Sequence, residues 1–179
     1  MRKDLIVASL AVTAVFPAQS APIEEINCPL EILSESEFEA LVDWVTENGS
    51  SSDPRIAALS NAAGTCTRRH GWSQSDFNWA IQFTTALANT AILSQELRSR
   101  GIDSERIEFI ILADDEFLRA MRSMEISEQV IMDMIYRNLT ALEDVVGQEF
   151  QDDILFGMIF QFAVARALQQ VSREQFVAG

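Results

Sequence analysis

A segment between residues 73 and 101 constrains the fold more than any other feature, because its apolar residues recur with a helical period on two faces. Ser73 and Asp76 have the spacing of a capping pair that begins a helix, and Gly101 is typical of a helix end. One face contains Phe77, Ala80, Ile81, Thr84, Ala88, Ala91 and Ile92, and the other contains Trp79, Phe83, Ala86, Leu93 and Leu97. Such a helix has about 27 residues and is about 40 Å long at 1.5 Å per residue. A helix that is apolar on two faces needs neighbours on both, so we expect it at the centre of the fold.

Similar patterns of a capping residue, a period of 3.6 and a terminating residue predict five further helices. They are expected from Ser34 to Gly49, from Asp53 to Gly64, from Asp103 or Ser104 to Glu125, from Ser127 to Gly147 and from Glu149 to Val171. Residues 65–72 are expected to form a loop. The apolar run from Phe109 to Leu112 is also compatible with a short strand, but no second strand is predicted to pair with it, so helix is favoured. Residues 34–179 are therefore expected to form one all-α domain, a compact and irregular bundle of five to six helices.

The first 20 residues have the pattern of an export signal. Arg2 and Lys3 form a positive start, and an apolar run follows from Leu5 to Phe16. Small residues at Ala18 and Ser20 predict cleavage after Ser20. The alternative, an uncleaved membrane anchor, is disfavoured because a span needs roughly 20 apolar residues. We therefore expect a signal peptide at residues 1–20, an extended segment at 21–33, and a periplasmic or secreted protein.

The most apolar stretch of the remaining chain is residues 154–165, in the last predicted helix. Gln161 interrupts this stretch and Arg166 follows it. Polar and charged side chains are costly at the centre of a bilayer. The stretch is therefore interpreted as a buried core helix, and no membrane span is expected after signal cleavage.

Cys28 and Cys66 are the two cysteines of the chain. In an oxidising compartment such a pair predicts a disulfide, here closing a loop of about 39 residues. A redox pair is disfavoured because no Cys-x-x-Cys motif is present. Two cysteines and one histidine also fall short of the four ligands of a structural zinc site, so no metal is expected.

The chain is strongly acidic, with 13 basic and 27 acidic residues and a net charge of −14. Loss of Arg2, Lys3 and Asp4 with the signal would make this −15 and leave no lysine. Such a charge argues against binding nucleic acid or an anionic membrane surface. Acidic neighbours such as Asp114–Glu116 and Asp152–Asp153 diverge around a helix, which favours a solvated face over a weak divalent-cation site. No glycine-rich phosphate motif is present, and no cofactor is expected.

Catalytic chemistry has few candidate residues. His70 is the one histidine, so a hydrolase or metal-dependent enzyme would have to be built around it. Ser73 and Asp76 lie close by, but the helix start already accounts for them. We therefore predict that the protein is not an enzyme, with a His70-based enzyme as the least favoured alternative.

Two groups of residues are candidates for binding. The first is a basic and aromatic patch of Arg68, Arg69, His70 and Trp72, which suits an acidic or carboxylate ligand or a partner protein. The alternative is structural: the arginines pair with nearby acids and Trp72 packs over the next helix. The second is an apolar pocket formed by Phe83, Met134, Met158 and Phe162. Methionine and phenylalanine at helical spacing are also ordinary core residues.

Together these features predict an exported, non-catalytic helical protein that acts by binding another protein. An inhibitor, an immunity protein, a chaperone-like protein or an envelope accessory protein would fit. The acidic surface favours a basic partner through electrostatic steering, although solubility explains it equally well. The main alternative is a carrier that holds an apolar small molecule in its helical core.

Overall fold

The computed structural model describes residues 21–47, 53–124, 127–147 and 152–178. Within these ranges the protein is all-helical and contains no strand, as predicted. The signal segment, the loop around Gly49, and the boundary residues Glu125 and Glu149 lie outside the described residues. The helices are η1 (Ile23–Asn27), α1 (Cys28–Ile32), α2 (Glu35–Thr46), α3 (Pro54–His70), α4 (Gln74–Ser99), α5 (Ser104–Leu112), α6 (Asp115–Arg122), α7 (Glu128–Arg137), α8 (Leu139–Val146) and α9 (Asp153–Ala178).

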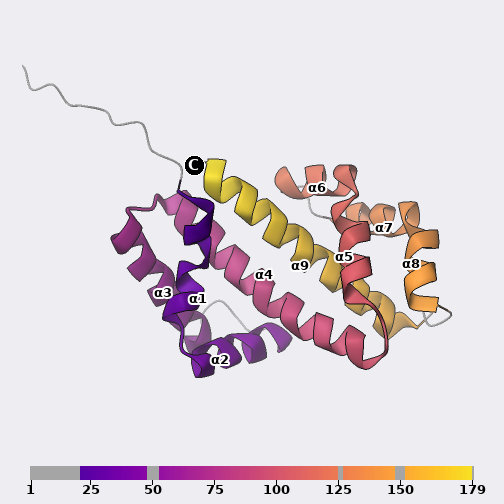
Figure 1. The fold of residues 1–179 in the computed structure, drawn as a ribbon, viewed down its shortest axis with the longest axis horizontal. Coiled ribbons are helices and arrows are strands. Elements are labelled where there is room, and N and C mark those ends of the chain that lie inside the picture. The colour runs from indigo at the N-terminus through magenta and orange to yellow at the C-terminus, as the bar shows by residue number, and fades with distance from the viewer. Residues whose placement is uncertain (1–20, 48–52, 125–126, 148–151, 179) are drawn as a thin grey trace, which may run out of the picture.

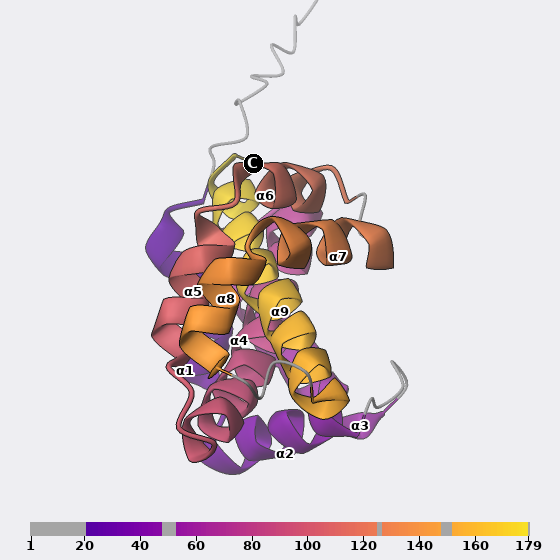
Figure 2. The same cartoon turned by 90° about the vertical axis from the view of Figure 1, so that its right-hand side faces the viewer.

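Two 26-residue helices, α4 and α9, lie side by side in opposite directions along the length of the molecule (Figure 1). Helices α1, α2 and α3 pack on one side of this pair, and α5 to α8 gather on the other. The turned view shows α5 and α8 next to each other beside α9 (Figure 2). The central position predicted for the helix between residues 73 and 101 is confirmed, because α4 contacts elements from both groups.

Local start and stop signals position these helices. Ser34 with Glu37, and Ser73 with Asp76, form reciprocal capping boxes. Asp53 caps α3 with Pro54 at its first position. Gly71 adopts a φ of 72°, a left-handed conformation that glycine adopts without a steric penalty and that ends α3.

The structure corrects two predictions in the N-terminal half of the chain. Residues 23–32 are helical rather than extended, and they bury Ile26 and Cys28. Residues 65–70 are not a loop, because α3 continues through Gly64 to His70. Glycine inside a helix costs about 1 kcal/mol relative to alanine, and burial of Ala63 and Cys66 on the inner face outweighs that cost.

The number of helices was also underestimated, because two predicted helices are each divided. The first is interrupted at Ala113 and Asp114, where the Asp114 carboxylate accepts the Phe117 N–H and begins α6. The second is interrupted at Asn138, whose side-chain amide donates to the Met134 carbonyl at 2.9 Å. Short polar side chains that bond to the backbone compete with a continuous helix. The prediction that Phe109–Leu112 is helical is confirmed.

Helix α9 alone, among the described helices, is long and apolar enough to cross a membrane, and 44% of its most apolar window is buried. It reaches Ala178, beyond the predicted end at Val171, because Phe176 is fully buried. Its polar residues contact neighbouring helices: Gln169 donates to the Ala86 carbonyl and to the Thr90 hydroxyl, at 3.1 and 2.6 Å. Buried polar contacts of this kind tie α9 to α4.

The Asp114 side chain, at the start of α6, contacts the residues where α7 ends and α8 begins. Its side chain is 6% exposed and accepts hydrogen bonds from Arg137 and from the Asn138 amide. Burial raises the pKa of Asp114, but the hydrogen bonds from Arg137, the Phe117 N–H and Asn138 outweigh burial and hold that pKa below its usual range.

Replacement of Asp114 by Asn is expected to lower the free energy of unfolding at pH 7 by about 1–3 kcal/mol, because Arg137 loses a buried anionic partner. A carboxyl with a depressed folded-state pKa stabilises fully above its unfolded pKa of about 3.9, and this contribution disappears as pH falls through the folded value. Urea unfolding of both proteins at pH 7 and at pH 3 measures this. The exposed neighbour Asp115, changed to Asn, is the control and should alter stability by less than about 0.5 kcal/mol. If the two proteins differed in stability as much at pH 3 as at pH 7, the stabilising role of the Asp114 carboxylate would be contradicted.

Candidate functional site

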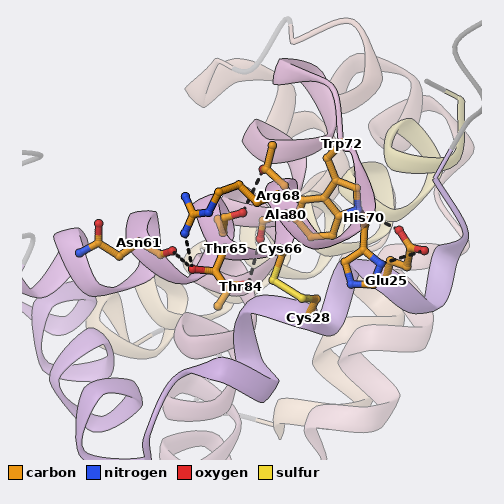
Figure 3. The surroundings of a disulfide bond; sticks show 12 residues. Glu25, Cys28, Asn61, Thr65, Cys66, Arg68, His70, Trp72, Ala80 and Thr84 are labelled. Atoms are coloured by element: carbon orange, nitrogen blue, oxygen red, sulfur yellow. Dashed lines mark hydrogen bonds and ion pairs between the residues drawn. A yellow bond between two sulfur atoms is a disulfide. The ribbon is translucent and has the colours of Figure 1, made fainter.

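The Cys28–Cys66 disulfide joins α1 to α3 and is the centre of a small apolar cluster (Figure 3). The two Cα atoms are 6.0 Å apart, and both cysteines are buried. Trp72 and Phe176 belong to the same cluster. The predicted disulfide is confirmed, and it fixes the N-terminal helices against the last turns of α3.

Glu25, on η1, holds two residues of the predicted patch. The Trp72 indole N–H donates to Glu25 Oε2 at 2.9 Å, and His70 Nδ1 lies 3.2 Å from Glu25 Oε1. The His70 ring stacks on Trp72 with centroids 5.8 Å apart, and the Trp72 and Phe176 rings meet in a T-shaped arrangement. His70 and Trp72 are therefore anchors for η1, and sequence reasoning missed Glu25 because it lies far away in the chain.

The four residues of the predicted patch have different surroundings. Arg68 and Arg69 are exposed at the end of α3, and Arg68 donates to the Thr65 hydroxyl at 2.9 Å, on the opposite side from Glu25 (Figure 3). Among the described residues neither arginine forms an ion pair with a carboxylate. The structure thus separates the two exposed arginines from His70 and Trp72, which both contact Glu25; Trp72 is buried, whereas His70 remains exposed.

The surroundings of His70 offer little for hydrolysis. Both cysteines are disulfide-bonded, and the Ser73 hydroxyl accepts the Asp76 N–H within the capping box. A nucleophile needs a base within hydrogen-bond distance, and the partner that His70 has here is Glu25. In the described part of the chain, no group of three or more histidine, cysteine or acidic residues is arranged to hold a metal ion.

A hollow of about 510 Å³ opens beside this cluster. We call it the N-terminal hollow; it is lined by Ala21, Pro22, Glu25, His70, Gly71, Trp72 and Asp76. Asp76 is 4% exposed, and its Oδ2 accepts the Ser73 N–H at 2.8 Å. Its Oδ1 is buried with no hydrogen-bond partner among the described residues. A buried acceptor without a donor is unusual in a folded protein.

The four residues of the predicted apolar pocket lie in packed apolar clusters. Met134 and Phe162 are fully buried in the main core, and Met158 packs against that core. Phe83 belongs instead to the disulfide cluster. The four residues are divided between two clusters, and none of them lines the N-terminal hollow or the hollows along α4 and α9.

Two adjoining hollows follow α4 and α9 along the surface. The first, of about 500 Å³, is lined by Trp44, Val45, Thr46, Thr85, Asn89, Ile92, Leu93 and Gln161. The second, of about 380 Å³, is lined by Ile81, Gln82, Thr85, Ala86, Asn89, Met124, Val164, Ala165 and Leu168. They share Thr85 and Asn89, and together we call them the α4–α9 groove. The second hollow is largely apolar, whereas the first combines polar and apolar side chains. Gln82, which lines the second hollow, has a buried Oε1 without a hydrogen-bond partner among the described residues.

No family model, no curated protein and no solved structure matches this chain. The N-terminal hollow and the α4–α9 groove are the two features of the described residues that we develop into functional proposals. The N-terminal hollow includes His70 and Trp72 of the predicted patch, whereas the α4–α9 groove was not expected from the sequence because it collects residues from separate helices.

Proposed function

We propose that the chain is exported as a disulfide-bonded helical protein and acts without catalysis, by binding a basic partner protein in the α4–α9 groove. The observation that carries the proposal is the groove itself, two hollows of about 500 and 380 Å³ that share Thr85 and Asn89. Amphipathic helices bind in apolar grooves between helices, with side chains three and four residues apart as anchors. Gln82 Oε1 would accept a hydrogen bond from the bound segment.

Charge favours a basic partner over a neutral one. Helix α2 forms one wall of the groove through Trp44 and Val45, and its outer surface is acidic. Its exposed acidic residues are Glu35, Glu37, Glu39 and Asp43. A cationic segment would be steered towards this rim, faster at low salt than at high salt.

Export is supported by two independent features. The sequence of residues 1–20 has the composition of a signal peptide, with cleavage after Ser20. The disulfide between Cys28 and Cys66 is of the kind that persists in oxidising compartments. The partner is therefore expected in the periplasm or the medium.

A carrier of an apolar small molecule is the second candidate. The second hollow of the α4–α9 groove supports this candidate, because Ile81, Val164 and Leu168 make an apolar lining. Its volume of about 380 Å³ falls within the size range of ligand sites. This moves the ligand site from the core, where sequence reasoning placed it, to the surface between α4 and α9.

A photo-cross-linking amino acid at Asn89 distinguishes these functions, because Asn89 lines both hollows. The control carries the same amino acid at Gln95, which is exposed on the same helix and lines neither hollow. We expect one discrete cross-linked protein from the exported fraction at Asn89 and none at Gln95. A small-molecule adduct would favour the carrier. Equal cross-linking at both positions, or none at either, would contradict binding in the groove.

Once the partner is identified, replacement of Asn89 by Arg is expected to weaken binding by at least about tenfold, or about 1.4 kcal/mol. The new side chain fills the groove and repels a basic segment. Isothermal titration calorimetry measures the affinity, and thermal unfolding checks that the fold is intact. Gln95→Arg adds the same charge outside the groove and should leave the affinity within about twofold, a change of less than about 0.5 kcal/mol. Equal losses in both variants would indicate a general charge effect.

A further inference from the structure

Ala21 occupies an unusual place for the first residue of a processed chain. In the full 179-residue chain it is 8% exposed, packs in the cluster around the disulfide and lines the N-terminal hollow with Asp76. The predicted cleavage after Ser20 would make its nitrogen the new N-terminus. First residues usually extend into solvent unless something holds them.

The hollow contains a buried hydrogen-bond acceptor without a donor in the described part of the chain. Asp76 Oδ1 is buried and without a hydrogen-bond partner among the described residues, although its other oxygen accepts the Ser73 N–H. Both Glu25 oxygens are already engaged, one with His70 and the other with Trp72. Leaving a buried acceptor unsatisfied is unfavourable, and more so when the group is charged.

We propose that the α-ammonium group created by cleavage between Ser20 and Ala21 binds the unpaired Asp76 carboxylate oxygen in the N-terminal hollow, so that removal of the signal completes the fold. The inference rests on the export proposed above. In the cleavage, water adds across the peptide bond: the new carboxylate leaves with Ser20 and the new ammonium stays on Ala21.

The chemistry of the nitrogen changes with this step. In the unprocessed chain the Ala21 nitrogen is an uncharged amide with one N–H. After cleavage it has three donors and a positive charge, and charge-assisted hydrogen bonds to a carboxylate are about twice as strong as neutral ones. The processed end would then fasten η1 on one side, as the disulfide fastens α1 on the other.

The sequence supplies a direct chemical probe of this contact. Lys3 is the only lysine in the chain, so a protein that begins at Ala21 has one primary amine, the α-amino group itself. An acetylating N-hydroxysuccinimide ester at pH 7.5 therefore reports on that nitrogen alone. Because only the neutral amine reacts, we expect acetylation of the native protein to be roughly tenfold slower than in urea, equivalent to a rise of about one unit in the α-amino pKa.

Two variants test whether Asp76 is the partner. Asp76→Asn should bring the native rate to within about twofold of the unfolded rate, since it removes a charge effect worth about tenfold. Ser73→Ala removes the capping hydroxyl but keeps the carboxylate, so acetylation should stay slow. A chain that retains Ser20 before Ala21 should react at the unfolded rate and melt about 3 °C lower, which keeps the test valid if Asp76→Asn does not fold.

The outcomes separate this inference from the export proposal. The intact mass of the protein from the exported fraction must first correspond to a chain beginning at Ala21. A mass for the uncleaved chain would overturn both proposals. A chain that begins at Ala21 but reacts equally fast in native and unfolded states would overturn this inference alone. Slow acetylation that persists in Asp76→Asn would also overturn it.

Discussion

Reduction of the Cys28–Cys66 disulfide is expected to lower the free energy of unfolding by roughly 4 kcal/mol, the value that chain entropy gives for a loop of about 39 residues. The reason is mainly the greater freedom of the unfolded chain once the link is cut. Urea unfolding with and without dithiothreitol measures the change. For a domain whose total stability is typically 5–15 kcal/mol, the loss would be large.

The destabilisation caused by reduction should be greatest in the N-terminal helices. Helices η1 and α1 have five residues each, far below the length at which an isolated helix is stable in water. Amide hydrogen exchange at Ile26 should therefore accelerate on reduction much more than exchange at Phe162 in the main core. The double variant Cys28→Ala/Cys66→Ala is the control, because dithiothreitol should not change its stability. A reduced protein within 1 kcal/mol of the oxidised one would contradict this account.

The parts of the fold that were predictable are those with local signals. The start of α4 follows from Ser73 and Asp76, which are three residues apart and cap the helix through their own contacts. Its central place follows from two apolar faces on one segment. Both features are properties of neighbouring residues, and a sequence displays them directly.

The helix boundaries that were predicted incorrectly have a different physical origin. At Gly64 the sequence contains a helix-weakening residue, but the burial of Cys66 and the disulfide to α1 decide the outcome. At Ala113 and Asn138 the apolar period runs on while polar contacts break the helix. Tertiary contacts override local propensity at these positions.

In the candidate sites, too, contacts between neighbouring residues were predictable and contacts between distant segments were not. The proximity of His70 and Trp72 was visible, but their partner Glu25 lies 47 residues before Trp72. Trp44 and Gln161 line the α4–α9 groove from α2 and α9, with nothing in either segment to connect them. Sites assembled from distant helices require the packing to be known first.

Replacement of Phe162 by Ala is expected to lower the free energy of unfolding by about 3–5 kcal/mol, the usual range for removing a fully buried phenylalanine. Phe162 is at 0% exposure on α9, in the main core with Met134 and Ile159. The cost combines the lost burial of the ring with the cavity left behind, because the surrounding α-helices can close that cavity only in part. Chemical denaturation of both proteins under oxidising conditions measures it.

Phe109→Ala is the matched control, because the Phe109 side chain on α5 is 76% exposed. The same substitution there should change stability by less than about 0.5 kcal/mol. The comparison also tests whether an apolar ligand binds in the core, the main alternative that the sequence indicated. A Phe162 that lined a ligand cavity would already lack close neighbours on one side, so its removal would cost far less than 3 kcal/mol. A small loss at Phe162 would therefore reopen a ligand site in the core, whereas a large loss leaves the α4–α9 groove as the place where an apolar ligand would bind.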